Sequence, residues 1–482
     1  MKNSTDTPAG PRDWSPEEFR AAGRELVDWV ARYLENVEEL PVLSRVKPGD
    51  IRRALPRSAP AEGEPFSALL RDLDQVVLPG VTHWNHPCFF AYFGITASAP
   101  GILGELAAAA LNTNAMLWRT SPSTTELEQV VLDWLREMIG LPEGLFGILT
   151  DTASVSTLCA LAAAREAVPG LDVRTAGLSG AGRLRLYTST QAHSSVEKAA
   201  ITLGLGLAGV RKIETDEAYR MLPAALAEAV REDRASGWIP FAVSATVGTT
   251  STTSVDPVEE LAQICRRESL WLHVDAAYAG SAAILPEYRW CMAGCQHADS
   301  LVTNPHKWLF TPIDASALYT RHPEVLRRAF HLVPDYLQSS EEAVNLMDYG
   351  VQLGRRFRAI KLWWVLRAFG VEGLRKRLRE HCRLGRLFAS WIDGDEGFQR
   401  MAPVPFSVVC FRATWPGLDD AQLDQRNQDL LERVNAGGRV YLSHTRLRGT
   451  YVLRLAVGNL RTEERHVRLA WDVLQAERGR VA

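Results

Sequence analysis

Two residues near the middle of the chain, an acid and a lysine, are of the types that could share one piece of chemistry. Asp275 follows the buried, β-rich run Leu270–Val274 and is itself followed by the small residues of Ala276–Gly280. An acid at the carboxyl end of a strand is well placed to contact a ligand, although an N-cap for the next helix would explain it about equally well. Lys307 stands 32 positions later within Asn304–Trp308, directly after another predicted strand. Its neighbours Pro, His and Trp are uncommon around a lysine whose charge is exposed to solvent.

A lysine in such surroundings can form a Schiff base with an aldehyde, because burial shifts its pKa readily. Considered without Asp275, Lys307 would more simply be interpreted as a surface residue. Together with Asp275 it matches what pyridoxal phosphate needs, an amine to hold the aldehyde and a carboxylate to keep the ring nitrogen protonated. The pair therefore predicts a pyridoxal-phosphate site.

An alternation of strands and helices between residues 86 and 380 would position these two residues. The predicted strands are Phe146–Thr150, Leu184–Thr188, Gly209–Ile213, Phe241–Ala245, Leu270–Val274, Ser300–Thr303 and Ala315–Tyr319. Seven such runs separated by helices predict an α/β fold with a seven-stranded, mostly parallel sheet covered on both faces. Ligands of such sheets bind beyond the carboxyl ends of the strands. Asp275 and Lys307 both follow strand ends.

The flanking segments predict two smaller units. Residues 1–85 are expected to form an N-terminal helical arm, because Ser15–Glu18 is typical of a helix start and Phe19, Leu26 and Val27 then begin an apolar stripe. That stripe has little of the chain to pack on, so we expect it to lie on a second subunit. The large domain is expected to span residues 86–380. A long helical stretch, Arg355–Phe388, is predicted across its C-terminal boundary.

Residues 381–482 are predicted to form a small C-terminal α+β domain. Its expected strands and helices are Phe406–Arg412, Val440–Ser443, Tyr451–Ala456, Asp419–Asn435 and Glu463–Gln475.

Composition excludes several classes of protein. The chain is 46% hydrophobic and 23% charged with a formal net charge of -3, so nothing favours a disordered chain or a nucleic-acid partner. We found no apolar run suited to a signal peptide or a membrane span, and the seven scattered cysteines suit reduced thiols. We therefore expect a cytoplasmic protein. Cys291, Cys295 and His297 lack a fourth ligand at convincing spacing, so no metal site is expected.

Three segments resemble the signatures of group II pyridoxal-phosphate decarboxylases, most closely the aromatic-L-amino-acid decarboxylases: His193–Ala199, His273–Gly280 and Asn304–Trp308. Val81–Trp84, Phe89–Phe93, Ser121-Pro122, Thr125–Glu128 and Leu353–Arg358 add to the resemblance, which is dense from about residue 15 to 380. It implies a fold-type I enzyme that acts as a homodimer, with active sites shared between the subunits.

The resemblance also implies roles for individual residues. Lys307 would hold the cofactor's aldehyde, Asp275 would pair with the ring nitrogen, and His193 would stack over the ring. Ala277 would pack on the opposite ring face, and Thr246 would lie near the ring and Asp275.

The cofactor's phosphate would bind at a helix start, where backbone N–H groups and the helix dipole favour an anion. The implied phosphate site consists of Ala153, Ser154, Asn304 and His306. Asp151 departs from the family, in which a glycine is usual at that position, and an acid beside a phosphate is electrostatically unfavourable.

A loop at residues 330–343 would close over the site and bring Tyr336, whose proton goes to the substrate α-carbon after CO2 leaves. Relatives with phenylalanine there tend to form aldehydes, so Tyr336 favours simple decarboxylation. The expected substrate pocket consists of Trp84, Tyr92, Phe93, Ile95 and Gly354. Ile95 replaces a threonine that could bond a ring hydroxyl, and Asn114 and Met116 replace apolar and aromatic residues that relatives contribute from the neighbouring subunit.

We therefore expect decarboxylation of an aromatic L-amino acid to its amine and CO2. The alternatives are a decarboxylase of a small acidic amino acid or an aromatic aldehyde synthase on the same fold. A catalytically silent relative is a third alternative, which the presence of Lys307, Asp275, His193 and Tyr336 disfavours.

Overall fold

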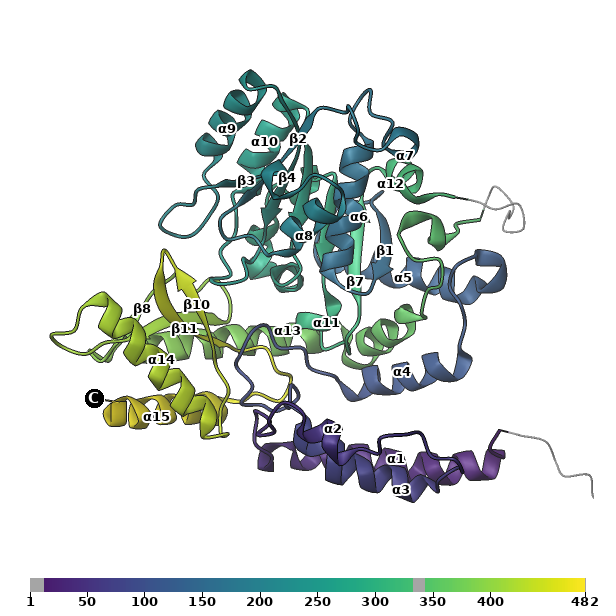
Figure 1. Ribbon diagram of the computed structural model, residues 1–482, viewed down its shortest axis with the longest axis vertical. Helices are drawn as coiled ribbons and strands as arrows, with labels where there is room; N and C mark the ends of the chain where they lie inside the picture. The colour runs from purple at the N-terminus through teal and green to yellow at the C-terminus, as the bar shows by residue number, and fades with distance from the viewer. Residues whose placement is uncertain (1–12, 333–342, 482) are drawn as a thin grey trace, which may run out of the picture.

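The computed structural model describes residues 13–332 and 343–481. A seven-stranded sheet forms the centre of its larger part (Figure 1), with strand order β1-β7-β6-β5-β4-β2-β3. Its strands are β1 Phe146–Thr150, β2 Arg183–Ser189, β3 Val210–Ile213, β4 Trp238–Thr246, β5 Trp271–Asp275, β6 Ser300–Thr303 and β7 Ser316–Thr320. Only β7 runs against its neighbours in this sheet, so the other six end at one common edge. The predicted mostly parallel seven-stranded sheet is confirmed.

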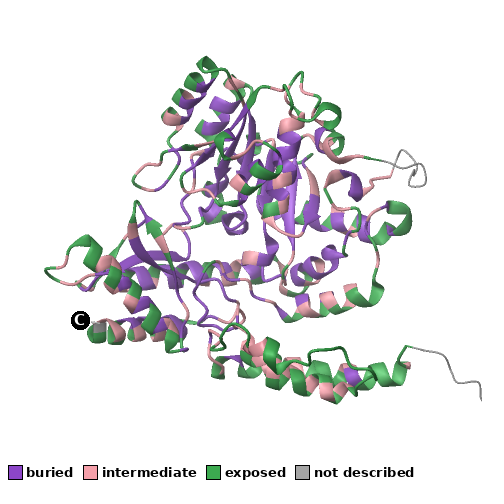
Figure 2. Ribbon diagram, viewed as in Figure 1, coloured by how far each residue is buried: buried purple, intermediate pink, exposed green. Residues whose placement is uncertain are grey.

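Helices cover both faces of this sheet. They are α4 Ala99–Leu111, α5 Pro122–Met138, α6 Ala153–Glu166, α7 Val173–Ala176, α8 Ser195–Thr202, α9 Pro223–Ala235, α10 Val258–Glu268, α11 Pro305–Trp308 and α12 Pro323–Phe330. Successive strand residues enter different apolar clusters: Leu318 packs with α6, α8 and α12, while Ala317 and Tyr319 pack with α5 and α10. This alternation follows from the two-residue period of a strand, and it leaves the sheet buried on both sides (Figure 2).

A second, four-stranded sheet lies in the C-terminal part, with order β10-β11-β9-β8. Its elements are β8 Phe398–Arg400, β9 Val408–Ala413, α14 Asp420–Ala436, β10 Ser443–Leu447, β11 Thr450–Ala456 and α15 Glu464–Val481. The helix α13, Arg358–Asp393, joins the two parts and carries a non-helical Gly370 (φ 63°). It crosses the predicted boundary at residue 380, and Cys88–Ala91 pack in the C-terminal cluster. The three-part division of the chain stays a prediction.

The strand predicted at Val440–Ser443 was wrong, because β10 begins only at Ser443. Tyr441 instead pairs with Phe89 through an isolated parallel bridge, and its N–H donates to the carbonyl of Cys88. The apolar residues of this segment are thus buried against a stretch far away in the sequence, which no local pattern indicates. The short edge strand β8 was not predicted.

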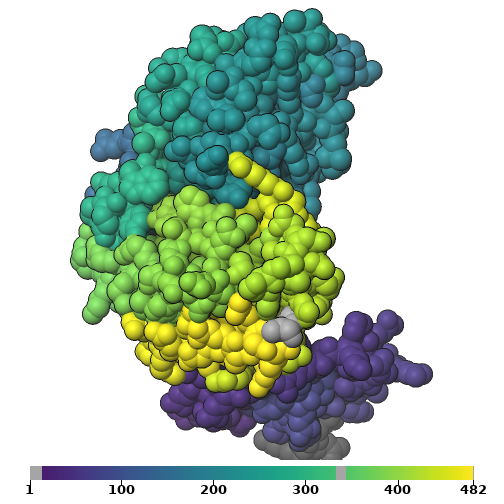
Figure 3. Space-filling model, turned by 90° about the vertical axis from the view of Figure 1, so that its left-hand side faces the viewer, coloured from purple at the N-terminus to yellow at the C-terminus, as the bar shows by residue number. Residues whose placement is uncertain are grey.

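The N-terminal segment forms three helices, α1 Pro16–Asn36, α2 Asp50–Ala54 and α3 Phe66–Asp72, which lie along the lower edge in Figure 1. A capping box fixes the start of α1: Ser15 Oγ accepts from the Glu18 N–H, and Glu18 accepts from the Ser15 N–H. Large apolar side chains remain exposed on α1, Phe19 at 61% and Val27 at 50%. Figure 3 shows these helices (purple) beneath the C-terminal part of the molecule.

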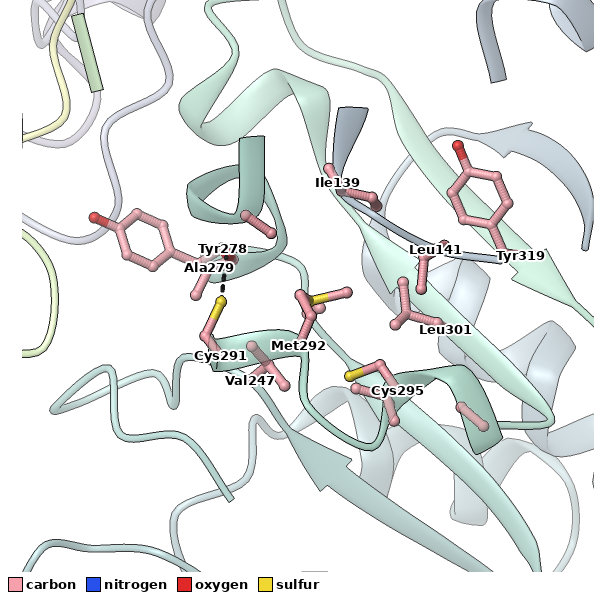
Figure 4. Packing of buried hydrophobic residues seen from close by; sticks show 14 of the residues in the cluster. Ile139, Leu141, Val247, Tyr278, Ala279, Cys291, Met292, Cys295, Leu301 and Tyr319 are labelled. Atoms are coloured by element: carbon pink, nitrogen blue, oxygen red, sulfur yellow. Dashed lines mark hydrogen bonds between the residues drawn. The ribbon is translucent and has the colours of Figure 1, made fainter. Parts of the chain in front are cut away.

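All seven cysteines are free and buried. Cys291 and Cys295 lie in the apolar core beside Met292 and Val247, and Cys291 Sγ donates only to the Ala279 carbonyl at 3.8 Å (Figure 4). Burial raises the pKa of the Cys291 thiol to about 12. Within residues 13–332 and 343–481, no group of three or more His, Cys, Asp or Glu could hold a metal ion. The same residues include no helix long and apolar enough to cross a membrane.

Candidate active site

The candidate site lies at the common edge where the parallel strands end. Thr246 ends β4 and is paired in register with Asp275, which ends β5 and is paired with Val302 of β6. The short helix α11 begins two residues after β6 and carries Lys307. Three neighbouring strands therefore bring Thr246, Asp275 and Lys307 to one place.

Lys307 is half-buried, with its Nζ 5.0 Å from the centroid of the Phe93 ring. Burial lowers the pKa of Lys307, the charge of Asp275 opposes this shift, and the charge of Arg454 adds to it. A lowered pKa increases the fraction of neutral amine, which is the form that condenses with an aldehyde.

Asp275 is buried, with 7% of its surface exposed, and its Oδ1 accepts the Ala277 N–H at 3.0 Å. Its negative charge acts on Lys307 and His193, since it raises the pKa of both against the effect of their burial, and it acts in the same way on His273 of its own strand. A carboxylate, an imidazole and an amine thus come within electrostatic reach of one another at the strand ends.

His193 follows β2 and precedes α8. Its Nδ1 accepts the Ser195 N–H at 3.1 Å and lies 2.9 Å from Ser195 Oγ. Burial lowers the pKa of His193, so the neutral ring, with its proton on Nε2, is the form favoured near neutral pH. Ser195 orients this ring, a role that sequence reasoning did not assign.

The predicted neighbours of the ring are both buried, Thr246 and Ala277 with 4% exposure each. The Thr246 N–H donates to Oδ2 of Asp256 at 2.8 Å, and Oδ1 of the same carboxylate accepts from the Met221 N–H at 2.8 Å. Burial raises the pKa of Asp256 to about 6. Asp256 thus holds the last residue of β4 in place, a role that was not predicted from the sequence.

The predicted phosphate turn has two donors to offer. The N–H groups of Val155 and Ser156 both donate to the Thr152 carbonyl, and the Thr152 side chain makes no capping bond. The amides of Ala153 and Ser154 belong to the first turn of α6 and have no acceptor within the helix, so among the described residues they remain free, and Ser154 is exposed. Two free amides at the end of a 14-residue helix fit a phosphate.

Asn304 and His306 are buried and held by protein atoms. Asn304 Oδ1 lies 2.7 Å from Ser316 Oγ, its Nδ2 lies 3.3 Å from His306 Nε2, and His306 Nδ1 accepts the Ala315 N–H at 3.0 Å. Burial lowers the pKa of His306 to about 3, so the ring is neutral. These bonds fasten α11 to β7, and the contact of either side chain with phosphate stays a prediction.

The pocket residues predicted from the sequence separate into two groups. Phe93 lies beside Lys307 and stacks on Tyr278 with ring centroids 4.0 Å apart. Tyr92 instead stacks on Trp84 (5.8 Å), and its hydroxyl lies 3.3 Å from that of Tyr441, with 52% of the residue exposed. Of these aromatic residues, Phe93 is the one whose ring faces the Lys307 ammonium group, while the rings of Trp84 and Tyr92 stack on each other.

Two further predicted pocket positions are Ile95, which is half-buried, and Gly354, which is exposed. A β-carbon at Gly354 would lie 3.9 Å from Nδ2 of Asn114, a residue whose Oδ1 accepts the Arg355 N–H. Tyr336 lies outside the described residues.

Arg454 of β11 is a site residue that sequence reasoning missed. Its guanidinium carbon lies 4.7 Å from the Phe93 centroid, and only 3% of the residue is exposed. Nε donates to the Ser251 carbonyl at 2.9 Å, Nη1 donates to the Tyr92 carbonyl, and Nη2 is buried with no partner in the described part of the chain. Within the described residues no carboxylate pairs with Arg454, and a buried guanidinium with a free donor suits an anionic ligand group. The only sequence signal was a charge inside an apolar strand.

Comparison with known proteins agrees with this geometry. The model of the pyridoxal-dependent decarboxylase conserved domain matches residues 48–414. The chain is 40% identical to phenylacetaldehyde synthase of a Rosa hybrid cultivar over 479 residues, covering 95% of this chain and 94% of that protein. It is 41% identical to tryptophan decarboxylase 2 of Oryza sativa subsp. japonica over 482 residues, covering 98% and 96%.

The solved structure of Oryza sativa TDC with PLP and tryptamine superposes with a TM-score of 0.94 at 38% identity, covering 98% of this chain and 99% of that one. The half-buried lysine, the buried carboxylate that acts on it and the two free helix amides are the groups that such a cofactor requires. The residues of this chain fit pyridoxal phosphate.

Proposed function

The chain belongs to the family of pyridoxal-dependent decarboxylases, and from this membership we propose that it converts an aromatic L-amino acid to the corresponding amine and CO2. The enzyme uses pyridoxal phosphate. The observation that carries the proposal is the convergence of Lys307, Asp275 and His193 at the carboxyl edge of the sheet, because that set suits this cofactor and little else.

Bound pyridoxal phosphate supplies a conjugated, electron-withdrawing ring, which stabilises the charge left on the α-carbon when CO2 departs. Lys307 would provide the amine that holds the cofactor's aldehyde. Asp275 holds the proton on the ring nitrogen, and its buried position makes that interaction strong. His193, which Ser195 orients, would pack over the ring of the bound cofactor and keep water from it.

Arg454 supplies the positive charge for the substrate carboxylate. Its unpartnered Nη2 and its position over Phe93 support this role, and Phe93 offers an aromatic surface to the substrate side chain. An aromatic amino acid has one carboxylate and an acidic one has two. The described residues bring one such guanidinium to the Phe93 ring, which favours the aromatic substrate.

An aromatic aldehyde synthase is the second candidate, because one relative that is 40% identical is a phenylacetaldehyde synthase. Tyr336 favours the amine product, since its hydroxyl can return a proton to the α-carbon. The deciding experiment incubates the cofactor-loaded enzyme with separate L-amino acids and quantifies amine, aldehyde, CO2 and hydrogen peroxide.

Amine and CO2 in equal amounts from Phe, Tyr or Trp would support the proposal, and Tyr336→Phe would then shift product towards aldehyde. Aldehyde with peroxide from the unaltered enzyme would favour the second candidate. Product only from Glu, Asp or cysteine sulfinate would overturn the assigned substrate class.

We further propose a homodimer in the cytoplasm. Exposed apolar residues on α1 and on α4, among them Phe19, Val27 and Leu106, support a second copy covering these helices, because exposed apolar area of this kind usually marks an interface. Seven unpaired cysteines support a reducing compartment. Sedimentation of the intact enzyme tests the first point: a monomer at micromolar concentration would contradict it, and Leu106→Glu should weaken the dimer.

A further inference from the structure

The turn between β1 and α6 contains an acid whose two oxygens are both engaged locally. Asp151 Oδ1 accepts the Thr152 N–H at 2.5 Å and lies 3.2 Å from Thr152 Oγ1. Oδ2 lies 3.4 Å from Nε2 of Gln352, in the segment before α13. Among the described residues, no lysine, arginine or histidine forms an ion pair with Asp151, so its negative charge is not neutralised by a cation.

This carboxylate changes what the turn offers to an anion. The Thr152 amide and hydroxyl would otherwise be available beside the free amides of Ala153 and Ser154, but Asp151 binds both. The carboxylate also places a full negative charge two residues before the helix start, where the helix dipole would otherwise favour a phosphate. It therefore acts on a phosphate in two ways, by competition for donors and by repulsion.

We propose that Asp151 weakens the binding of the cofactor phosphate, and that the Gln352 amide limits this effect by donating to the same carboxylate. The inference rests on the proposed function, because it requires pyridoxal phosphate to place its phosphate at Ala153 and Ser154. Its consequence is an enzyme whose cofactor exchanges more readily than that of a site with a neutral turn. Gln352 then tunes cofactor affinity without touching the cofactor.

Equilibrium titration of the full-length apoenzyme with pyridoxal phosphate, followed by visible absorbance, tests the proposal at low and high salt. Asp151→Asn keeps the side-chain shape and removes the charge, so at low salt the Kd should fall about tenfold. Gln352→Glu adds a negative charge against Asp151, so the Kd should rise by a similar factor. Both differences should shrink at 1 M salt, where charges are screened.

The opposite signs separate electrostatics from damage to the turn, because a merely structural role would make both variants bind more weakly. Asp133→Asn is the matched control: this acid of α5 is 66% exposed and 3.5 Å from Arg136, and its loss should leave the Kd unchanged. A Kd for Asp151→Asn equal to or above that of the unaltered enzyme would overturn the inference and leave the proposed function intact. Absence of any visible absorbance in all the proteins would overturn the proposed function, and this inference with it.

Discussion

Replacing Arg454 by methionine should separate function from stability. The substitution keeps an unbranched, flexible stem of about the length of the arginine methylenes and removes the charge over Phe93. If the guanidinium binds the substrate carboxylate, its loss removes a charge-assisted interaction worth about 1.5–3 kcal/mol. At about 1.4 kcal/mol per factor of ten, kcat/KM should fall roughly 10- to 150-fold.

The folded protein should tolerate the same change. Arg454→Met removes hydrogen bonds to the carbonyls of Ser251 and Tyr92, at a cost of about 1 kcal/mol each. It also removes a buried cation that has no carboxylate partner among residues 13–332 and 343–481, which returns a desolvation penalty of several kcal/mol. The free energy of unfolding should therefore change by less than about 2 kcal/mol in either direction.

A matched control lies in the same sheet. Arg412 of β9 is also buried, but it pairs with Asp424 at 2.7 Å and with Asp420 at 2.9 Å. Arg412→Met removes the charge-assisted bonds to Asp424 and Asp420, although Asp424 keeps its ion pair with Arg446 at 3.0 Å, so it should destabilise the fold by about 1–3 kcal/mol with little effect on kcat/KM. Steady-state kinetics and urea unfolding of both variants check the contrast.

Retained kcat/KM in Arg454→Met would refute the carboxylate role. A loss of activity that only parallels a loss of stability would refute the argument from an unpaired charge. Arg454→Lys keeps the charge without the planar donors, so it should recover part of the activity.

Three further predictions concern titratable side chains that are partly or fully buried. Lys307→Ala should abolish turnover and the visible absorbance of the bound cofactor while leaving the unfolding midpoint nearly unchanged; retained absorbance would show that another amine holds the aldehyde. Burial lowers the pKa of four histidines to values of about 3 to 4: His86, His273, His306 and His381. Their unfolded pKa is about 6.5, so the unfolded chain binds more protons below that pH, and each should cost about 1.4 kcal/mol of stability per pH unit as the pH falls from 6.5 towards 4. Urea unfolding at pH 7 and 5.5 measures this, and equal stability at both would contradict it. Glu128→Gln should destabilise the fold by about 3–5 kcal/mol, because it leaves Arg355, bonded to Glu128 at 2.7 Å, buried and unpaired; Glu128→Gln with Arg355→Met should recover much of that loss.

The sequence was informative where the chemistry is local. Asp275 and Lys307 each follow a buried, β-rich run, so their position at the carboxyl edge follows from the strand pattern alone. The bounds of β1 and β6 were predicted correctly for the same reason. Ser195 could have been assigned from its spacing, since a residue two positions after His193 at a helix start is within reach of the ring.

Features that depend on contacts between residues far apart in the sequence could not be predicted from it. Arg454 reaches the site from β11, more than a hundred residues after Lys307, and nothing local distinguishes it from a structural arginine. Tyr92 and Phe93 are adjacent in sequence, and only the fold decides that Phe93 lies beside Lys307 while Tyr92, at φ 53°, stacks on Trp84. A pattern of aromatic residues predicts a cluster, but it does not say which face of the cluster meets the ligand.

The charges of the site should favour the substrate carboxylate more than the cofactor phosphate. Near Phe93, the basic side chains of Lys307 and Arg454 lie with one buried acid, Asp275, which supports the proposal that this end binds a substrate carboxylate. At the start of α6, Asp151 opposes the phosphate that the helix amides favour. Since the charge of Arg454 also lowers the pKa of Lys307, a carboxylate that binds Arg454 would cancel that effect and favour the protonated lysine. On the proposed role of Arg454, substrate binding and the protonation state of Lys307 would be coupled, and Arg454→Met should raise the pKa of Lys307 in the apoenzyme.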